Sequence, residues 1–291
     1  SFLTVQEGCD KFCKFCVVPY TRGPEYSRNF DDIIKEADQL ISNGSKEITL
    51  IGQNVNAYQY KDKKLSDIIV KLNEKKELKR IRYTTSHPKD MTEDLLETYV
   101  SCEKLMPLLH LPVQSGSDKI LKSMNRKHNI KEYLEITEKL KKKNSRIKFT
   151  SDFIIAYPGE DEKDFKLTCK LMQEVMFINS YSFVFSPRPG TPASELKLVD
   201  DEIAKKRLLS FQNIAEKVKF EYKKSLLTKK LKILFENKIG IDKYFGRDEF
   251  QNSVVIRSQK DLIGLEKNVI VKEFNKQTIF GELIESDNIA A

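Results

Sequence analysis

Short β-rich runs and amphipathic helical stretches alternate along most of this 291-residue chain. Clustered Val, Ile, Phe and Tyr predict strands over Phe2–Gln6, Glu47–Ile51, Arg80–Thr84, Leu108–Leu111, Lys148–Ile155 and Tyr181–Phe185. Helical periodicity follows each strand, over Asp31–Ser42, Leu65–Asn73, Thr92–Ser101, Ser117–Lys143 (broken near Asn129), Asp161–Met176 and Asp200–Leu227.

Successive strand–helix units predict parallel strands joined by right-handed crossovers, an α/β fold. There are too few units for a closed eight-fold barrel, so we expect a partial (β/α)6 barrel, with a doubly wound sheet as the alternative. In both arrangements, ligands bind at the C-terminal ends of the strands. The unusual segments of the chain follow these ends, at Cys9–Cys16, Gly52–Tyr58, Thr84–Pro88, Pro112–Asp118, Ala156–Glu160 and Ser186–Pro192.

The pattern changes after Leu227 to short alternating runs separated by turns. These predict strands over Lys232–Glu236, Lys243–Phe245, Ser253–Arg257, Asn268–Phe274 and Ile279–Ile284. Five short strands suggest a small antiparallel β-barrel of the oligonucleotide-binding type. We therefore expect two domains, residues 1–227 and 228–291.

The net charge of +8 is concentrated in two basic stretches. Residues 119–148 hold eleven Lys and Arg against three Glu, and residues 197–232 hold eleven against five acids. Such stretches suit a polyanion, although a solvated lysine-rich helix face has the same composition. No apolar run is long enough to cross a membrane, and we expect a cytoplasmic protein. The chain opens without Met on a predicted strand, so we expect a fragment that lacks its N-terminal part.

Three of the five cysteines, Cys9, Cys13 and Cys16, lie within eight residues in a C-x3-C-x2-C run. This spacing differs from a disulfide framework and is typical of thiolate ligands to an iron–sulfur cluster. Three thiolates leave the fourth iron of a [4Fe–4S] cluster open to S-adenosylmethionine, whose one-electron cleavage gives a 5′-deoxyadenosyl radical. The alternative is a structural zinc site, which needs a fourth ligand. Cys102 and Cys169 fall on predicted helices and are interpreted as packing residues.

With Phe15 before the third cysteine, the run resembles that of the radical S-adenosylmethionine (SAM) superfamily. Further motifs resemble its MiaB-type tRNA methylthiotransferases: residues 16–23, Gly52–Tyr58, residues 85–88, residues 110–118 and residues 188–193. The resemblance implies attachment of a methylthio group to C2 of N6-isopentenyladenosine beside the tRNA anticodon. It implies a [4Fe–4S] cluster, SAM and an electron donor such as a flavodoxin or ferredoxin, with a second cluster on the missing N-terminal domain.

Two other functions remain open. The same chemistry could act on a ribosomal-protein aspartate or on threonylcarbamoyladenosine in tRNA. From a different class, a non-catalytic RNA-binding protein could use the three cysteines as a structural metal site.

The resemblance also implies site residues. Cys9, Cys13 and Cys16 would be the cluster ligands and the catalytic centre. Cofactor contacts would come from Phe15, Gly52, Gln53, Gln114, Ser115, Ser151, Asp152, Ile154, Phe185, Ser186 and Arg188. The terminal barrel resembles an RNA-binding TRAM domain, in which Lys243, Arg247 and Phe250 would bind RNA. Local turn capping is the alternative role for the polar cofactor-site residues.

Overall fold

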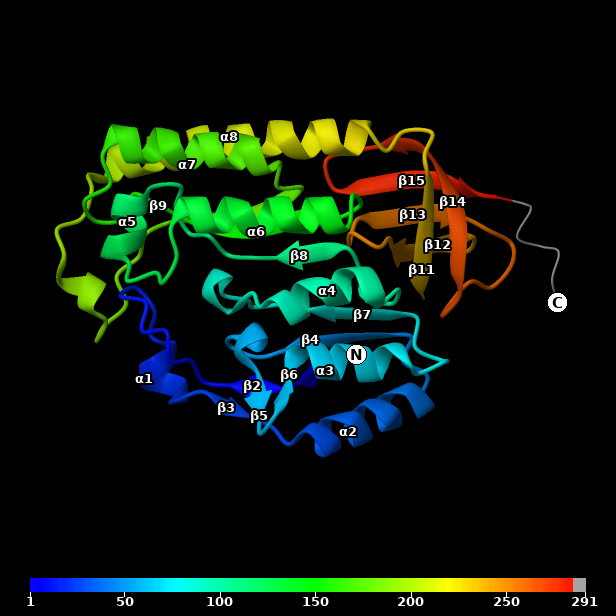
Figure 1. Ribbon diagram of the computed structural model, residues 1–291. Coiled ribbons are helices and arrows are strands. Elements are labelled where there is room, and N and C mark those ends of the chain that lie inside the picture. Colours follow the sequence, from blue (N-terminus) through cyan, green and yellow to red (C-terminus); the bar gives the residue numbers. More distant parts are fainter. Residues whose placement is uncertain (285–291) are drawn as a thin grey trace. The chain divides into compact units, whose positions relative to one another are not determined.

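The computed structural model describes residues 1–284 and divides the chain into two compact units, Ser1–Glu216 and Lys217–Ala291 (Figure 1). The division falls inside helix α8 (Asp201–Lys224), earlier than the predicted boundary at 227/228. The last turns of α8 belong to the second unit because Tyr222 and Phe220 pack there, Tyr222 through a hydrogen bond from Asn252 and Phe220 against the ring of Phe274.

Parallel strands form two three-stranded sheets in the first unit. One has the order β1 (Phe2–Thr4), β4 (Glu47–Ile51), β7 (Arg80–Tyr83), and the other β8 (Leu108–His110), β9 (Lys148–Ile155), β10 (Asn179–Val184). A single bridge between Ile81 and Leu105 links the two sheets. The strands follow one another in chain order, without the reversal of a doubly wound sheet, so the predicted partial barrel is confirmed.

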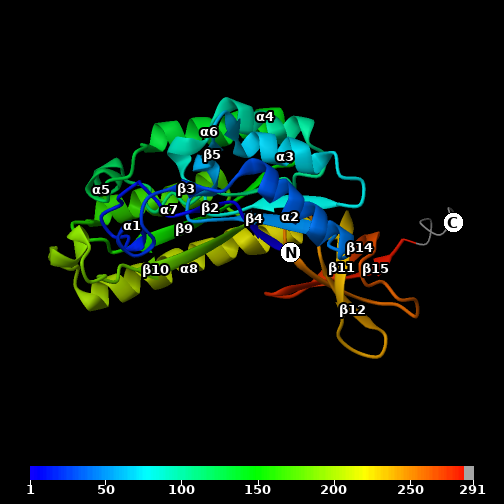
Figure 2. The same cartoon turned by 90° about the horizontal axis from the view of Figure 1, so that it is seen from below.

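Helices cover one face of these strands. The main ones are α2 (Phe30–Ser42), α3 (Leu65–Asn73), α4 (Glu93–Ser101), α6 (Ile130–Lys143) and α7 (Glu162–Val175). Figure 2 shows α3, α4 and α6 side by side on the outside of the strands. Strand residues that face them, such as Leu3, Ile48 and Leu50, are fully buried. No helix in residues 1–284 is long and apolar enough to cross a membrane.

The predicted break near Asn129 separates two helices. Helix α5 (Asp118–Ser123) ends at Ser123, and α6 begins after Asn129. The Asn129 side chain accepts from the Glu132 N–H, and the Glu132 carboxylate accepts from the Asn129 N–H, so the start of α6 is capped. Residues 124–129 therefore form a connector beside the strand ends. The short elements are β2 (Gln6–Glu7), α1 (Val18–Arg22), β3 (Tyr26–Ser27), η1 (Val55–Ala57), β5 (Gln59–Tyr60), β6 (Lys63–Lys64), η2 (Pro88–Asp90) and η3 (Pro192–Glu195).

The second unit contains a closed barrel of order β11-β12-β13-β15-β14. Its strands are β11 (Lys230–Lys238), β12 (Lys243–Arg247), β13 (Ser253–Arg257), β14 (Glu266–Phe274) and β15 (Thr278–Leu283). The predicted small barrel is confirmed: four of its five strand pairings are antiparallel, and β13 and β15 pair in parallel. Fully buried Ile233, Val254 and Val269 lie in its core.

A substitution at Gly246 tests how closely the strands of this barrel pack. A Cβ at Gly246 would overlap the Leu234 carbonyl oxygen and crowd Ile233, so Gly246→Ala should lower the free energy of unfolding by about 1–3 kcal/mol. Gly240→Ala is the matched control, because a Cβ there meets only the Lys243 side chain at 3.5 Å or more. Denaturant unfolding followed by circular dichroism measures both. Equal stability of the two variants would contradict the packing argument.

Candidate functional site

The three clustered cysteines lie on the loop between β2 and α1, at the end of the first unit where the strands finish. In Figures 1 and 2, α1 and α5 mark this end at the left. Cys13 is buried, and Cys9 and Cys16 are half-buried; all three are free thiols. The Cys9 N–H donates to the Gly23 carbonyl at 3.2 Å, and a Cβ at Gly8 would overlap the Pro24 carbonyl oxygen. The start of the loop therefore lies against the segment that follows α1.

Gln6 fixes this loop to the one that follows β4. Its side chain is fully buried, and its Oε1 accepts from the backbone N–H groups of Gln53 (3.0 Å) and Asn54 (2.8 Å). Its Nε2 donates to the Gly8 carbonyl at 2.7 Å. A Cβ at Gly52 would overlap the Gln6 carbonyl oxygen, so the close approach requires glycine. Gly52 is therefore needed for the backbone geometry of the site.

A polar network holds the tip of the loop. Lys11 forms an ion pair with Asp90 at 2.9 Å, and Asn54 Nδ2 donates to Asp90 (2.8 Å) and Glu25 (3.0 Å). Burial acts to lower the pKa of Lys11, but the hydrogen bond and charge of Asp90 outweigh it, and the net shift is upward. Residues distant in sequence thus fix the position of the loop.

The α5–α6 connector contacts the loop from another side. Asn125 Nδ2 donates to the Phe12 carbonyl at 2.8 Å, and the Lys14 N–H donates to the Met124 carbonyl at 2.9 Å. Arg126 donates through Nη1 to Cys13 Sγ at 3.5 Å and through Nη2 to the Pro112 carbonyl at 2.7 Å. A guanidinium group therefore points at one of the three sulfurs.

Two buried histidines lie beside Arg126. The rings of His87 and His128 are 5.7 Å apart in a T-shaped contact. Burial, followed by the charge of Arg126, lowers the pKa of His128 to about 3, and the pKa of His87 is also strongly lowered by burial and by Arg126. Both rings are therefore neutral near pH 7, and Arg126 remains the cation that faces the cysteine loop.

Burial changes the acidity of two of the three thiols. Burial raises the pKa of Cys9 to about 11, with smaller contributions from Glu25 and from the other two cysteines, and burial also raises the pKa of Cys16. Metal ions must therefore displace protons when they bind here. Within residues 1–284, no three His, Cys, Asp or Glu side chains come together as ligands of a single metal ion.

Three of the predicted cofactor contacts lie together on an apolar surface next to this loop. Phe15 and Ile154 pack against a cluster that contains Phe185, Tyr157 and Met124, and the rings of Tyr157 and Phe185 are 5.1 Å apart. Phe15 and Ile154 are half-buried, so each retains accessible surface. The sequence thus identified residues from three separate strand ends that share one apolar cluster.

The polar residues among the predicted cofactor contacts differ in how deeply they are buried. Ser115 and Ser151 are fully buried, and the Ser151 hydroxyl accepts from Val113 (2.9 Å) and donates to Leu111 (3.0 Å). The Ser115 hydroxyl lies 3.3 Å from the Thr168 hydroxyl and accepts from the Ser117 N–H at 3.2 Å. Gln53 accepts from the Gly8 N–H at 2.8 Å.

Other predicted contacts are more accessible. Asp152 lies 3.5 Å from His110, whose Nδ1 is 2.9 Å from the Thr150 hydroxyl. Ser186 and Arg188 are exposed on the loop after β10.

Left-handed backbone conformations gather at the same strand ends. Phe12, Thr85, Gln114 and Ala156 have φ of 48°, 66°, 75° and 57°, although none is glycine. Each follows a different strand. Such residues cost free energy and persist where the surrounding structure determines them, which is typical of binding sites.

Sequence reasoning missed Gln6, Asn54, Asp90 and Arg126. Gln6, Asp90 and Arg126 stand in no motif, and Asn54 lies in the Gly52–Tyr58 motif without having been predicted as a site residue. For Arg126 the available signal was its place in the helix break, beside the predicted active face.

The predicted RNA-binding residues lie on the small barrel. Lys243 and Arg247 are exposed on β12; Arg247 pairs with Glu236 at 2.6 Å and lies over the ring of Phe245. Phe250 is half-buried, with its ring 6.5 Å from that of Tyr222. Lys243 and Arg247 are therefore accessible, whereas Phe250 also packs.

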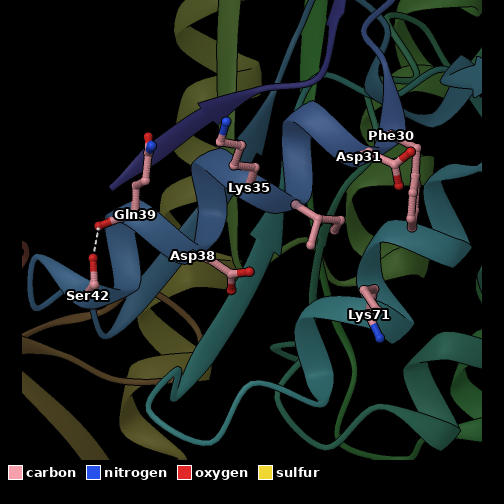
Figure 3. Close-up of a pocket in the computed structure, with 8 residues that line it drawn as sticks. Phe30, Asp31, Lys35, Asp38, Gln39, Ser42 and Lys71 are labelled. Carbon is pink, nitrogen blue, oxygen red and sulfur yellow. Dashed lines mark hydrogen bonds between the residues drawn. The ribbon is translucent and has the colours of Figure 1, made fainter.

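A hollow of about 630 Å³ lies on helices α2 and α3, away from the cysteine loop (Figure 3). Its lining residues are Phe30, Asp31, Ile34, Lys35, Asp38, Gln39, Ser42 and Lys71. These residues carry both positive and negative charges, and none of them is a predicted site residue. We assign the site to the cysteine loop.

The chain matches the radical SAM superfamily over residues 3–172, and it belongs to that superfamily. The superfamily uses a [4Fe–4S] cluster and S-adenosylmethionine. A relative from Pelagibacter ubique (strain HTCC1062), tRNA-2-methylthio-N(6)-dimethylallyladenosine synthase, is 57% identical over 98% of this chain and 65% of its own length. Its namesake from Wolbachia sp. subsp. Brugia malayi (strain TRS) is 48% identical over 90% of this chain and 61% of its own length. The chain thus spans less than two thirds of these relatives.

Solved structures support the fold. Coproporphyrinogen III oxidase (HemN) from Escherichia coli, a radical SAM enzyme, superposes with a TM-score of 0.55 at 13% identity, covering 98% of this chain and 72% of its own. The radical SAM methyltransferase TsrM from Kitasatospora setae gives a TM-score of 0.56 at 11% identity, over 67% of this chain and 38% of its own.

Gln6 should control the position of the cysteine loop. Gln6→Met keeps the approximate volume but leaves the partly buried Gln53 N–H and the buried Asn54 N–H without their acceptor, so the free energy of unfolding should fall by roughly 2–4 kcal/mol. The exposed Gln39→Met on α2 is the control. Thermal unfolding measures both, and unchanged stability of Gln6→Met would contradict this role.

Glu160, after β9, provides a pH test. It is 5% exposed and pairs with Arg207 at 3.1 Å, yet burial raises its pKa from 4.5 to about 7. The folded chain therefore binds this proton more tightly than the unfolded chain. The stabilisation is present below about pH 4.5 and is lost as the pH rises through 7.

The unfolding free energy of wild type minus that of Glu160→Gln should therefore fall by about 3 kcal/mol between about pH 4.5 and pH 8. Glu162→Gln is the control, because Glu162 also lies near Arg207 but is 62% exposed. Denaturant titrations at each pH measure the difference. A pH-independent difference for Glu160→Gln would contradict the burial argument.

Proposed function

We propose that this chain is the catalytic portion of a tRNA methylthiotransferase, which adds a methylthio group to C2 of N6-isopentenyladenosine next to the anticodon. The cysteine loop at the strand ends of a radical SAM barrel carries the proposal. The proposed tRNA substrate is supported by the names of two relatives that are 57% and 48% identical to the chain. The reaction takes place in the cytoplasm, and a flavodoxin or ferredoxin supplies electrons.

Cys9, Cys13 and Cys16 would hold the [4Fe–4S] cluster through their thiolates. When bound, the cluster with its open iron supplies the electron that cleaves S-adenosylmethionine. Arg126 Nη1 donates to Cys13 Sγ at 3.5 Å and would stabilise a cluster-bound thiolate at that position by a charge-assisted hydrogen bond.

The remaining residues orient the substrates. Phe15, Ile154 and Phe185 provide an apolar surface for the adenosine of S-adenosylmethionine. Polar contacts come from Gly52, Gln53, Gln114 and Asp152, with Ser186 and Arg188 at the exposed rim; Ser115 and Ser151 are fully buried. Lys243, Arg247 and Phe250 of the small barrel contact the tRNA.

Anaerobic reconstitution with iron and sulfide tests the cofactor assignment. The chain should take up roughly four iron ions, show broad iron–sulfur absorbance and release 5′-deoxyadenosine from S-adenosylmethionine when reduced. Each single variant Cys9→Ala, Cys13→Ala and Cys16→Ala should lose nearly all of this activity. Cys102→Ala is the control, because Cys102 is 4% exposed at the end of α4. A colourless protein with tightly bound zinc would exclude this chemistry.

The substrate is tested in cells that lack the full-length gene. Nucleoside analysis of their tRNA should show N6-isopentenyladenosine without its methylthio group. Loss of a modification on threonylcarbamoyladenosine, or on a ribosomal-protein aspartate, would assign the chemistry to that substrate instead.

A further inference from the structure

A second hollow adjoins the cysteine loop at the α5–α6 connector. Its volume is about 590 Å³, and its lining residues are Asp118, Lys122, Asn125, Arg126, Lys127, His128, Asn129 and Lys131. Four of these side chains are cationic and one is acidic. The charge balance of this hollow thus differs from that of the mixed-charge hollow on α2 and α3.

The lysines of the hollow are available for a ligand. Lys122, Lys127 and Lys131 are exposed, and none of them forms an ion pair with a residue in the described part of the chain. Lys127 donates to Asn125 Oδ1 at 2.8 Å. The single acid, Asp118, accepts from the Ile130 N–H at 2.7 Å, so one of its oxygens is occupied. The hollow therefore attracts anions.

The other lining residues connect the hollow to the cysteine loop. Both Nη atoms of Arg126 donate hydrogen bonds within the protein, to Cys13 Sγ and to the Pro112 carbonyl. Unlike the lysines, Arg126 is therefore already bound to other groups of the chain. His128 is neutral, because burial lowers its pKa to about 3, and it contributes a wall without charge. Asn125 lines the hollow and donates to the Phe12 carbonyl.

Two exposed aromatic rings lie near this connector: Phe12 on the cysteine loop, whose carbonyl accepts from Asn125, and Tyr20 on α1, which contacts Phe12. Phe12 is 49% exposed and Tyr20 is 55% exposed, and their rings meet edge to face at 6.1 Å. Phe12 is held in a left-handed conformation with φ of 48°, which a non-glycine residue rarely adopts. Exposed aromatic rings next to unpaired lysines are the combination by which proteins bind single-stranded RNA, through base stacking and phosphate contacts.

We propose that Lys122, Lys127 and Lys131 bind the phosphate backbone of the RNA substrate, and that Tyr20 and Phe12 stack on an unpaired base beside the cysteine loop. This surface rests on the proposed function for the identity of its ligand. It places an RNA contact on the catalytic unit itself, in addition to the contacts of the small barrel.

The test is the binding of a fluorescein-labelled anticodon stem–loop RNA to the reconstituted full chain, followed by anisotropy at several salt concentrations. The variant Lys122→Gln/Lys127→Gln/Lys131→Gln should bind at least about tenfold more weakly, and the slope of log affinity against log salt should become shallower by about 2. The matched control is Lys35→Gln/Lys71→Gln/Lys163→Gln, which removes three exposed lysines from α2, α3 and α7. It should keep the wild-type slope.

Tyr20 separates stacking from charge. Tyr20→Ala should weaken binding by about fivefold or more without changing the salt slope, and Tyr20→Phe should restore it. If both lysine triples lower affinity and slope equally, the binding is a general charge effect and the proposed surface is wrong. Wild-type affinity in the first triple would also overturn it. If the wild-type chain itself fails to bind the RNA, the proposed tRNA substrate fails instead, which is a distinguishable result.

Discussion

The site depends on the close approach of two backbone segments at Gln6 and Gly52. No side chain fits at Gly52, and the buried Gln6 amide joins the loop after β2 to the loop after β4 by hydrogen bonds in both directions. A buried amide that satisfies several backbone groups is rigid, because any displacement leaves donors or acceptors unpaired in a low-dielectric interior. The position of the cysteine loop is thus set from outside, and the cysteines are free to serve as ligands.

The same principle explains the distribution of strain. Phe12, Thr85, Gln114 and Ala156 adopt left-handed conformations in four loops that follow different strands. One such residue could be a local accident of a turn, but four at one edge of the barrel show that the loops are shaped by their mutual packing. The cost of these conformations is offset by the fully buried helix-facing residues of the strands, such as Leu50 and Phe153. The rigid barrel thereby holds a preorganised edge.

Much of this architecture follows from local pattern. Glu47–Ile51 and Lys148–Ile155 were predicted to the residue, because their apolar runs end at strong turn signals. The cysteine spacing and the helix break at Asn129 were equally legible. The parallel pairing of β13 with β15 could not be predicted, because the pairing of short strands depends on barrel closure and leaves no periodic pattern in the sequence. Gln6, Asn54 and Asp90 were missed for a related reason, since they act through partners distant in sequence. Ser151, predicted as a cofactor contact, is fully buried and accepts a hydrogen bond from backbone, which its sequence position does not indicate.

Arg126 gives the site its electrostatic character. Its charge is the second cause, after burial, of the lowered pKa values of both His87 and His128, and it also opposes the raised pKa of Cys16. One guanidinium therefore disfavours positive charge on the imidazoles and favours negative charge on sulfur. Two ionisable rings beside a three-cysteine loop would otherwise change its charge state in the physiological range. Because burial and Arg126 hold both rings neutral, neither imidazole changes the charge near the sulfurs in the physiological range. The reduction potential of an iron–sulfur cluster depends on such neighbouring charges and on hydrogen bonds to its sulfurs, and Arg126 provides both.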